Sequence, residues 1–243
     1  MHRPATPTAS QRRPAVPPRA LVIGAGGHGR VVLDILLQCG GCDVVGFLDS
    51  NAAIHGRRVD GIPVLGPIEA LEPLAAEHRV DGVIVAIGDN GVRRGLARWI
   101  ETTGVPLATA VHPSATLARN AQLGHNVVVA AGVVICAHCQ VGDSVILNTG
   151  CIVDHQTMIG EGSHICPGVR IAGRVKVEPG AFIGIGATVI PKVTIGCESI
   201  IGAGAVVIED VPPMATVVGV PAKPVRLPQA SEEVAAMLLP ARL

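Results

Sequence analysis

The chain of 243 residues contains almost no aromatic side chains: they make up 1% of the sequence, and tyrosine is absent. A core without aromatic rings has to be filled by small and β-branched side chains, which pack well in short stacked strands. The chain also lacks an excess of charge of one sign, because 19 Lys and Arg residues balance 19 Asp and Glu residues. This balance provides no attraction for DNA, RNA or an anionic membrane, so we expect no nucleic-acid partner.

Long apolar runs are absent too, although the mean hydropathy is high at +0.49. No stretch of about 18 residues is free of glycine, proline and charge, so we expect no membrane partner. Residues 1–19 are rich in proline and arginine and lack the apolar stretch of a secretory signal, which indicates a disordered leader. Seven cysteines without an export signal favour reduced thiols and a cytoplasmic location.

An aliphatic residue recurs every six positions from Val111 to Val207, without interruption. A small or β-branched residue stands four positions after each one, from Ala115 to Val211. A helical solenoid cannot keep a period of six on one face, whereas a parallel β-helix with whole hexapeptides in each coil can. The pattern therefore predicts a prism of short strands. Its corners are predicted to hold the glycines at the second or fourth place of many repeats, namely Gly124, Gly142, Gly160, Gly168, Gly184, Gly186, Gly202 and Gly204.

The first half of the chain alternates predicted strands and helices, which indicates a small Rossmann-like α/β domain with a mainly parallel sheet. The expected strands cover 20–24, 44–49, 62–65 and 83–87, and the expected helices cover 30–39, 67–78 and 92–102.

A glycine-rich turn follows the first of these strands. Gly24, Gly26 and Gly29 form a G-x-G-x-x-G pattern, and Asp49 ends the second strand. N–H groups at such a helix start attract phosphate, and an acidic residue at the next strand end accepts hydrogen bonds from ribose or a base. About 85 residues are too few for both halves of a dinucleotide domain, so a nucleoside diphosphate sugar is favoured over NAD.

The hexapeptides resemble the left-handed β-helix of hexapeptide acyltransferases, and GVPAKPVR at residues 219–226 is similar to that family's closing motif. The segments GAGGHGRVVLDIL, GFLDS and AIGDNGVRR resemble bacterial enzymes that N-acetylate nucleotide-linked 4-amino-4,6-dideoxysugars, and the related sialic acid O-acetyltransferase-like group. The resemblance covers residues 20–226. It implies three hexapeptides in each coil, acetyl-CoA as co-substrate, and a homotrimer with coenzyme slots between neighbouring prisms.

This resemblance divides the chain into four parts. They are a leader (1–19), a nucleotide-sugar-binding α/β domain (20–106), a left-handed β-helix acetyltransferase domain (107–226) and a C-terminal tail (227–243).

Functional residues follow from the same resemblance. His155, in the segment NTGCIVDHQ, would be the general base, since an imidazole accepts protons near neutral pH. The Gly173 N–H would receive the thioester carbonyl. One well-known form of the motif has Glu directly after the histidine; Gln156 stands there instead, and Asp154 is considered as the compensating group. The implied substrate residues are Gly26, Gly27, His28, Asp49 and Ser50, and the implied coenzyme residues are His164, Gly173, Ile185, Ala203 and Lys223.

The sequence also contains two C-x-x-C pairs, Cys39 with Cys42 and Cys136 with Cys139. We expect no metal, because Cys139 falls on the inward column of the repeat and Cys136 does not. Cys151 also falls on that column, which favours direct attack over an acyl-cysteine.

In the expected mechanism a sugar amine, lodged between the α/β domain and the prism, loses its proton to His155 while it attacks the thioester. Three alternatives stay open. They are acetylation of a sialic acid or other sugar hydroxyl, a nucleotide-sugar-binding module without activity, and a pyridine-nucleotide enzyme.

Overall fold

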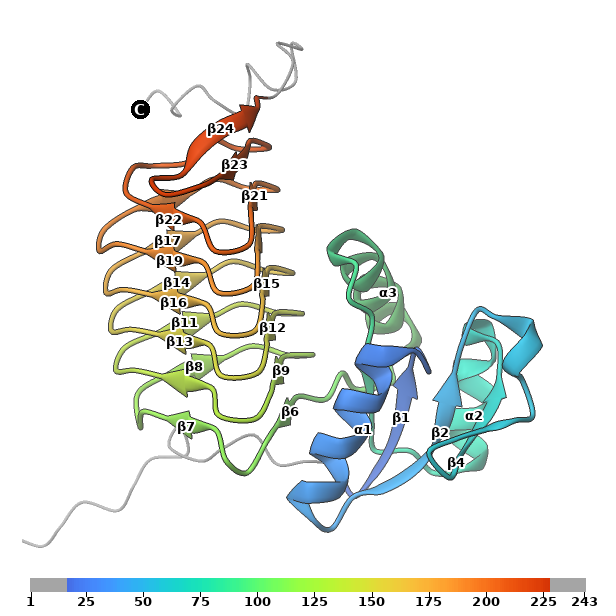
Figure 1. Ribbon diagram of the computed structural model, residues 1–243. Coiled ribbons are helices and arrows are strands. Elements are labelled where there is room, and N and C mark those ends of the chain that lie inside the picture. Colours follow the sequence, from blue (N-terminus) through green and yellow to red (C-terminus); the bar gives the residue numbers. More distant parts are fainter. Residues whose placement is uncertain (1–16, 228–243) are drawn as a thin grey trace, which may run out of the picture.

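The structure is a computed structural model that describes residues 17–227, and its first part is an α/β domain (Figure 1). Four parallel strands lie in the order β4-β2-β1-β5, and β3 pairs antiparallel with β4 at one edge. The strands are β1 (Arg19–Ile23), β2 (Asp43–Leu48), β3 (Arg58–Val59), β4 (Ile62–Gly66) and β5 (Gly82–Val85). The helices are α1 (Gly27–Cys39), α2 (Leu71–Glu77) and α3 (Asn90–Thr103), with short 3-10 turns η2 (Ala52–Ile54) and η3 (Ile68–Ala70).

Helices cover both faces of this sheet, and one face is shared with the second domain. Leu71, Ala75 and Ile100 of α2 and α3 pack on one side of the sheet. On the other side, α1 packs in one apolar cluster with Val128 and Ile146 of the prism. Helix α1 therefore provides apolar contacts between the α/β domain and the prism.

The second part is a prism of two- to four-residue strands stacked in three sheets, which we call faces A, B and C and in which all strands except β24 are parallel. Face A contains β6 (Ala110–Val111), β9 (Val128–Val129), β12 (Ile146–Leu147), β15 (His164–Ile165), β18 (Phe182–Ile183), β21 (Ile200–Ile201), β23 (Thr216–Val218) and β24 (Lys223–Arg226). Face B contains β7 (Thr116–Leu117), β10 (Val134–Ile135), β13 (Ile152–Val153), β16 (Arg170–Ile171), β19 (Thr188–Val189) and β22 (Val206–Val207). Face C contains β8 (Gln122–Leu123), β11 (Gln140–Val141), β14 (Met158–Ile159), β17 (Lys176–Val177) and β20 (Thr194–Ile195).

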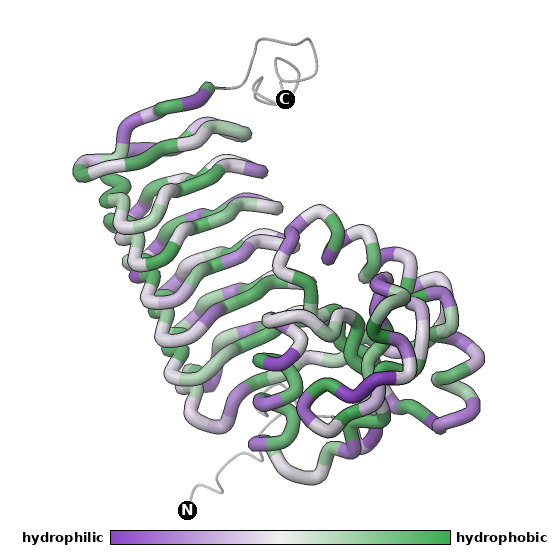
Figure 2. The backbone as a smooth tube through the Cα atoms, turned by 45° about the vertical axis from the view of Figure 1, so that its right-hand side comes forward, coloured by the Kyte–Doolittle hydropathy of each residue, from purple (hydrophilic) through white to green (hydrophobic). Residues whose placement is uncertain are grey.

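Each coil of the prism contains three hexapeptides. The register shows this directly, because Val134 pairs with Thr116 below it and with Ile152 above it, 18 residues away in each direction. The aliphatic column predicted from the sequence points inward: Val129, Leu147 and Ile165 are fully buried. Figure 2 shows the same arrangement as hydrophobic and hydrophilic segments that alternate within each coil. The prediction of an α/β domain followed by a hexapeptide β-helix is confirmed.

The corner glycines serve two different purposes, of which the sequence analysis assigned only one. Fourth-place residues such as Gly168 and Gly186 turn the corner with positive φ angles of 69° and 68°. Second-place glycines such as Gly160 do not have a positive φ. A Cβ on Gly160 would lie 2.5 Å from the backbone nitrogen of Pro179, so these glycines allow adjacent coils to approach.

The described chain ends on β24, which folds back antiparallel along β23. Most of the predicted leader (1–16) and of the predicted tail (228–243) lies outside the described residues. Among the helices of residues 17–227, none is long and apolar enough to cross a membrane.

Candidate active site

His155 lies on the prism edge between faces B and C, in the turn that follows β13, and its side chain is exposed. Its Nδ1 lies 3.3 Å from Oε1 of Gln156, and the same oxygen accepts a hydrogen bond from Nε of Arg174 at 3.1 Å. Because a guanidinium only donates, this arrangement identifies the Gln156 atom as the carbonyl oxygen. The imidazole therefore carries its proton on Nδ1, which leaves Nε2 as the proton acceptor.

Gly173 lies one coil above His155, directly against the ring. A Cβ on Gly173 would lie 2.6 Å from both Cε1 and Nε2 of the imidazole, so only glycine leaves room for the ring. Its carbonyl accepts from Lys192 at 3.2 Å. Within residues 17–227 its N–H donates no hydrogen bond. The edge thus places an available N–H donor beside a proton acceptor.

Asp154 does not face the imidazole. Its Oδ1 accepts from the backbone N–H of His155 at 2.7 Å. Burial raises the pKa of the Cys136 thiol, and the charge and a hydrogen bond of Asp154 raise it further. The group that holds the ring is Gln156, and the carboxylate shapes the turn beneath it.

The glycine-rich turn presents open space in front of α1. Gly26 is the N-cap of the helix and has no side chain to occupy the first N–H groups. A Cβ at Gly26 or Gly27 would meet nothing within 4 Å, whereas one at Gly29 would lie 2.0 Å from the Gly24 carbonyl oxygen. The turn is therefore closed behind by helix packing and open in front, where an anion can approach the N–H groups.

Asp49 supports this turn from the end of β2. Its Oδ2 accepts from the backbone N–H of Ala25 and its Oδ1 from that of Asn51, both at 2.8 Å. Ser50, the next residue, is exposed. Part of the acceptor capacity of Asp49 is thus used to hold the turn in place.

His28 of α1 and His164 of β15 meet where the α/β domain rests on face A, with ring centroids 6.4 Å apart. Phe182 of β18 packs edge-on against His164 at 5.2 Å. Burial, the neighbouring His164 and the charge of Arg93 lower the pKa of His28 to about 4. Burial and Arg93 likewise lower the pKa of His164 to about 4. Both rings are therefore neutral at physiological pH.

The remaining predicted coenzyme residues lie higher on the prism. Ile185 and Ala203 occupy the edge between faces A and B and are linked along it by the hydrogen bond from Gly204 N–H to the Ile185 carbonyl. Ile185 is 61% exposed, so its side chain is open to an apolar contact. Lys223 lies on β24 and forms an exposed ion pair with Glu209 at 3.7 Å.

The structure separates the predicted residues into two groups. His155 and Gly173 lie on the edge between faces B and C, whereas His164 lies on face A, Ile185 lies at the border of faces A and B, and His28 approaches His164 from α1. One prism side spans six residues, or at most about 20 Å at the rise of an extended strand. The α/β domain packs against the lower strands of face A (Figure 1), and in a three-sided prism the edge between faces B and C lies opposite that face. His155 and the glycine turn of one chain therefore lie on different sides of its prism, and the expected place of the sugar, between the α/β domain and the prism, stays a prediction.

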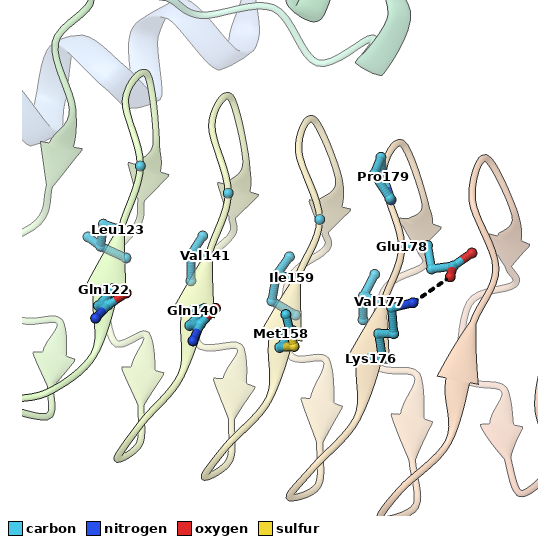
Figure 3. A pocket seen from close by; sticks show the side chains of 13 residues that line it. Gln122, Leu123, Gln140, Val141, Met158, Ile159, Lys176, Val177, Glu178 and Pro179 are labelled. Carbon is cyan, nitrogen blue, oxygen red and sulfur yellow. Dashed lines mark hydrogen bonds and ion pairs between the residues drawn. The ribbon is translucent and has the colours of Figure 1, made fainter. Parts of the chain in front are cut away.

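Two hollows accompany these edges. A groove of about 480 Å³ runs over β8, β11, β14 and β17 of face C, where Lys176 pairs with Glu178 (Figure 3). None of the predicted site residues lines it. A smaller hollow of about 320 Å³ lies between α1 and the edge of faces A and B. Its lining includes Arg30, Asp34, His112 and Thr149.

The cysteine pairs diverge. Cys139 is fully buried in the prism, whereas Cys136 is half-buried. Cys39 lies near the prism, with its Sγ 3.2 Å from the Val111 carbonyl oxygen. In the part of the chain that the structure describes, no group of three or more His, Cys, Asp or Glu residues is arranged to hold a metal ion.

Sequence reasoning missed two contributors. From the sequence, Gln156 is interpreted only as the replacement of an acidic residue. Its amide oxygen is nevertheless sufficient to select the His155 tautomer that carries the proton on Nδ1. Arg93, in AIGDNGVRR, is fully buried between the two domains. Its only signal in the sequence is a charged residue within the apolar pattern of a helix.

Comparisons with known proteins agree with this architecture. Residues 19–100 match the family model described as the PglD N-terminal domain. A perosamine N-acetyltransferase from Caulobacter crescentus, solved with CoA and GDP-perosamine, is 41% identical, with a TM-score of 0.80 over 84% of this chain and 95% of that chain. The acetyltransferase domain of PglB from Neisseria gonorrhoeae, solved with acetyl coenzyme A, is 36% identical, with a TM-score of 0.81 over 85% and 98% of the two chains.

A curated relative, the UDP-N-acetylbacillosamine N-acetyltransferase of Bacillus subtilis, is 32% identical over 110 residues, which are 45% of this chain and 50% of the relative. The matches thus span half or less of the curated relatives, but nearly all of the solved ones. The chain belongs to the hexapeptide-repeat sugar acetyltransferase family.

Proposed function

We propose that the protein is an acetyl-CoA-dependent N-acetyltransferase that acts on the amino group of a nucleotide-linked 4-amino-4,6-dideoxysugar. The observation that carries this proposal is the pairing at one edge of a proton acceptor, Nε2 of His155, with the free N–H of Gly173. Relatives solved with CoA and with GDP-perosamine support the two substrate classes.

The reaction needs only these groups and the two substrates. The amine lone pair attacks the thioester carbonyl carbon, and the amine proton passes to Nε2 of His155. The Gly173 N–H donates to the oxyanion that forms on the carbonyl oxygen. When the intermediate collapses, the C–S bond breaks, CoA leaves as a thiolate that takes up a proton, and the nitrogen keeps the acetyl group as an amide.

The acceptor end of the site belongs to the α/β domain. The open N–H groups at Gly26 and Gly27 suit the diphosphate of a nucleotide sugar, because a helix start attracts negative charge. His28 lies in the same turn and meets the prism at His164, so a sugar bound here extends toward face A. Neutral rings at this point offer hydrogen bonds to sugar hydroxyl or phosphate oxygens without adding charge.

The site is completed by a neighbouring copy. Because His155 and the α/β domain of one chain lie on different sides of the prism, the amine reaches a base only when another chain supplies it. In the proposed cyclic trimer, each copy would present its edge of faces B and C to the edge of faces A and B of the next copy.

The levels along the prism indicate which residues would meet in such an assembly. In a ring whose axis runs along the prism, equal heights of neighbouring copies face each other. His155 lies within the coil that begins at Thr149, below Pro167. His155 of the neighbouring copy would thus face the edge of faces A and B at the level between Thr149 and Pro167. This level lies beside the hollow next to α1 and just below Ile185, one of the proposed coenzyme residues.

Release of CoA, followed with a thiol reagent, tests this function. The acceptors are UDP-, dTDP- and GDP-linked 4-amino-4,6-dideoxysugars, with matched 4-hydroxy sugars and free sialic acid as alternatives. We expect turnover of at least one amine, its loss in His155→Ala, and its retention in the control His138→Asn, which changes an exposed histidine one coil lower on the same edge. CoA release with a hydroxyl acceptor alone would assign the protein to O-acetylation. No CoA release with any acceptor would contradict the proposal that the protein is an acetyltransferase.

A further inference from the structure

Arg93 of α3 is fully buried between the α/β domain and the prism. Its Nη1 donates to the carbonyl oxygens of Ile87 at 2.9 Å and Gly88 at 3.1 Å, in the loop after β5. Its Nε donates to the Ser144 carbonyl at 2.7 Å and its Nη2 to the Gly162 carbonyl at 2.8 Å, both on the prism. One guanidinium therefore ties the α/β domain to two successive coils.

Asn90, one turn earlier on α3, extends this connection. Its Oδ1 accepts from Nη2 of Arg93 at 2.8 Å, and its Nδ2 donates to the Gly180 carbonyl at 2.9 Å, one coil further up. The two side chains thus bind three consecutive coils at the edge of faces C and A.

Every acceptor of the Arg93 guanidinium is neutral. No carboxylate among residues 17–227 forms an ion pair with it, and burial lowers its pKa to about 10. A buried cation without an anion is a poor source of stability, because an apolar contact of the same volume avoids the desolvation cost. The hydrogen bonds of Arg93 are therefore better explained by the orientation that they impose on the two domains than by a contribution to stability.

The bonds of Arg93 end next to the residues on which the proposed site depends. Gly162 and Ser163, whose carbonyls face the guanidinium, directly precede His164. Across the interface, His28 of the α/β domain lies 6.4 Å from His164, measured between ring centroids. The guanidinium thus fixes the prism strand on one side and the loop next to the glycine turn on the other.

We propose that Arg93 is a positioning residue for acetyl transfer: it sets where the acceptor, carried by the α/β domain, meets the coenzyme, carried by the prism. This inference rests on the proposed function. The two substrates are bound by different domains, so an error in the placement of the domains leaves each binding site intact and misaligns the amine with the thioester. A misplacement of about 1 Å costs on the order of 100-fold in rate.

The variant Arg93→Lys tests this role, because a lysine keeps the charge but cannot reach acceptors in both domains at once. Arg98→Lys is the matched control: Arg98 lies on the same helix and contacts the prism through an exposed ion pair with Glu161 at 3.1 Å. We expect Arg93→Lys to lower kcat by about 10- to 100-fold, with the KM values of acetyl-CoA and of the nucleotide sugar within about threefold of wild type. Arg98→Lys keeps the wild-type kcat, because exposed ion pairs contribute little.

A milder variant, Asn90→Ala, tests the same positioning role if Arg93→Lys does not fold. It removes the bond to the Gly180 carbonyl and one acceptor of Arg93, and we expect a smaller fall in kcat with unchanged KM values. An unchanged kcat in the folded variants overturns the proposal, as does a parallel change of kcat, both KM values and the thermal midpoint. If the wild type itself transfers no acetyl group, the proposed function fails first.

Discussion

Two inactive variants of this protein are expected to restore activity in each other, because in the proposed trimer the base and the acceptor site of each active centre come from different copies. His155→Ala removes the base and leaves the glycine turn intact. Gly27→Glu removes the acceptor site and leaves the base intact. A Cβ at Gly27 meets nothing within 4 Å, and a carboxylate is well tolerated in the first turn of a helix, so this variant folds. Its charge repels the diphosphate of the nucleotide sugar.

The size of the recovery follows from the ring geometry. In trimers assembled at random from equal amounts of both chains, a centre is intact only when its base comes from a Gly27→Glu copy and its acceptor site from a His155→Ala copy. About a quarter of the centres meet this condition in a cyclic arrangement with one base and one acceptor site at each interface. We therefore expect the mixture to reach about a quarter of the wild-type rate.

The assay is CoA release from trimers that are co-expressed, or unfolded and refolded together. Gly95→Glu is the control, because it adds the same charge at an exposed position of α3 where a Cβ also meets nothing within 4 Å, and it leaves the glycine turn unchanged. A mixture that is no more active than the two variants measured separately would refute the division of the site between chains.

Three further predictions concern individual residues. Gly173→Ala places a Cβ 2.6 Å from the His155 ring; we expect kcat to fall by about 100-fold at an unchanged thermal midpoint, and normal turnover would contradict the packing. Gln156→Asn suits the positive φ of 59° at this corner but is too short to hold Nδ1; we expect kcat to fall by about tenfold, with the KM of acetyl-CoA unchanged. The pKa values of His28 and His164 are lowered to about 4, so the unfolded chain takes up protons that the folded chain does not between pH 6.5 and 4. As the pH is lowered over this range, the free energy of unfolding therefore decreases, on the order of a few kcal/mol. Denaturant titrations at several pH values measure this decrease, and the same pH profile in His28→Gln would contradict the assignment.

The prism was predictable because its physics is local and repeats. An aliphatic residue six positions after the last one can only stay inside a structure whose period is six, so the inward column from Val129 to Val207 follows from the sequence alone. The α/β alternation was equally readable, although α1 and α3 each begin earlier than predicted, at Gly27 and Asn90.

The location of the active centre was not predictable in the same way. Spacing along the chain gave the level of His155 on the prism, but it did not say which face the α/β domain covers. That choice depends on contacts between distant segments, such as the apolar contact of α1 with Ile146 and the hydrogen bonds of Arg93. The role of Gln156 also depends on three-dimensional geometry, because it requires Arg174 one coil above.

The position of the acetyl group in the product distinguishes N-acetylation of the sugar from O-acetylation. After reaction of acetyl-CoA with the acceptor that turns over, two-dimensional NMR of the purified nucleotide sugar distinguishes an amide on the C-4 nitrogen from an ester on a ring hydroxyl. We expect a single acetyl group on nitrogen, formed by the wild type and not by His155→Ala. An ester on oxygen, or the same amide formed at the same rate without His155, would contradict this expectation.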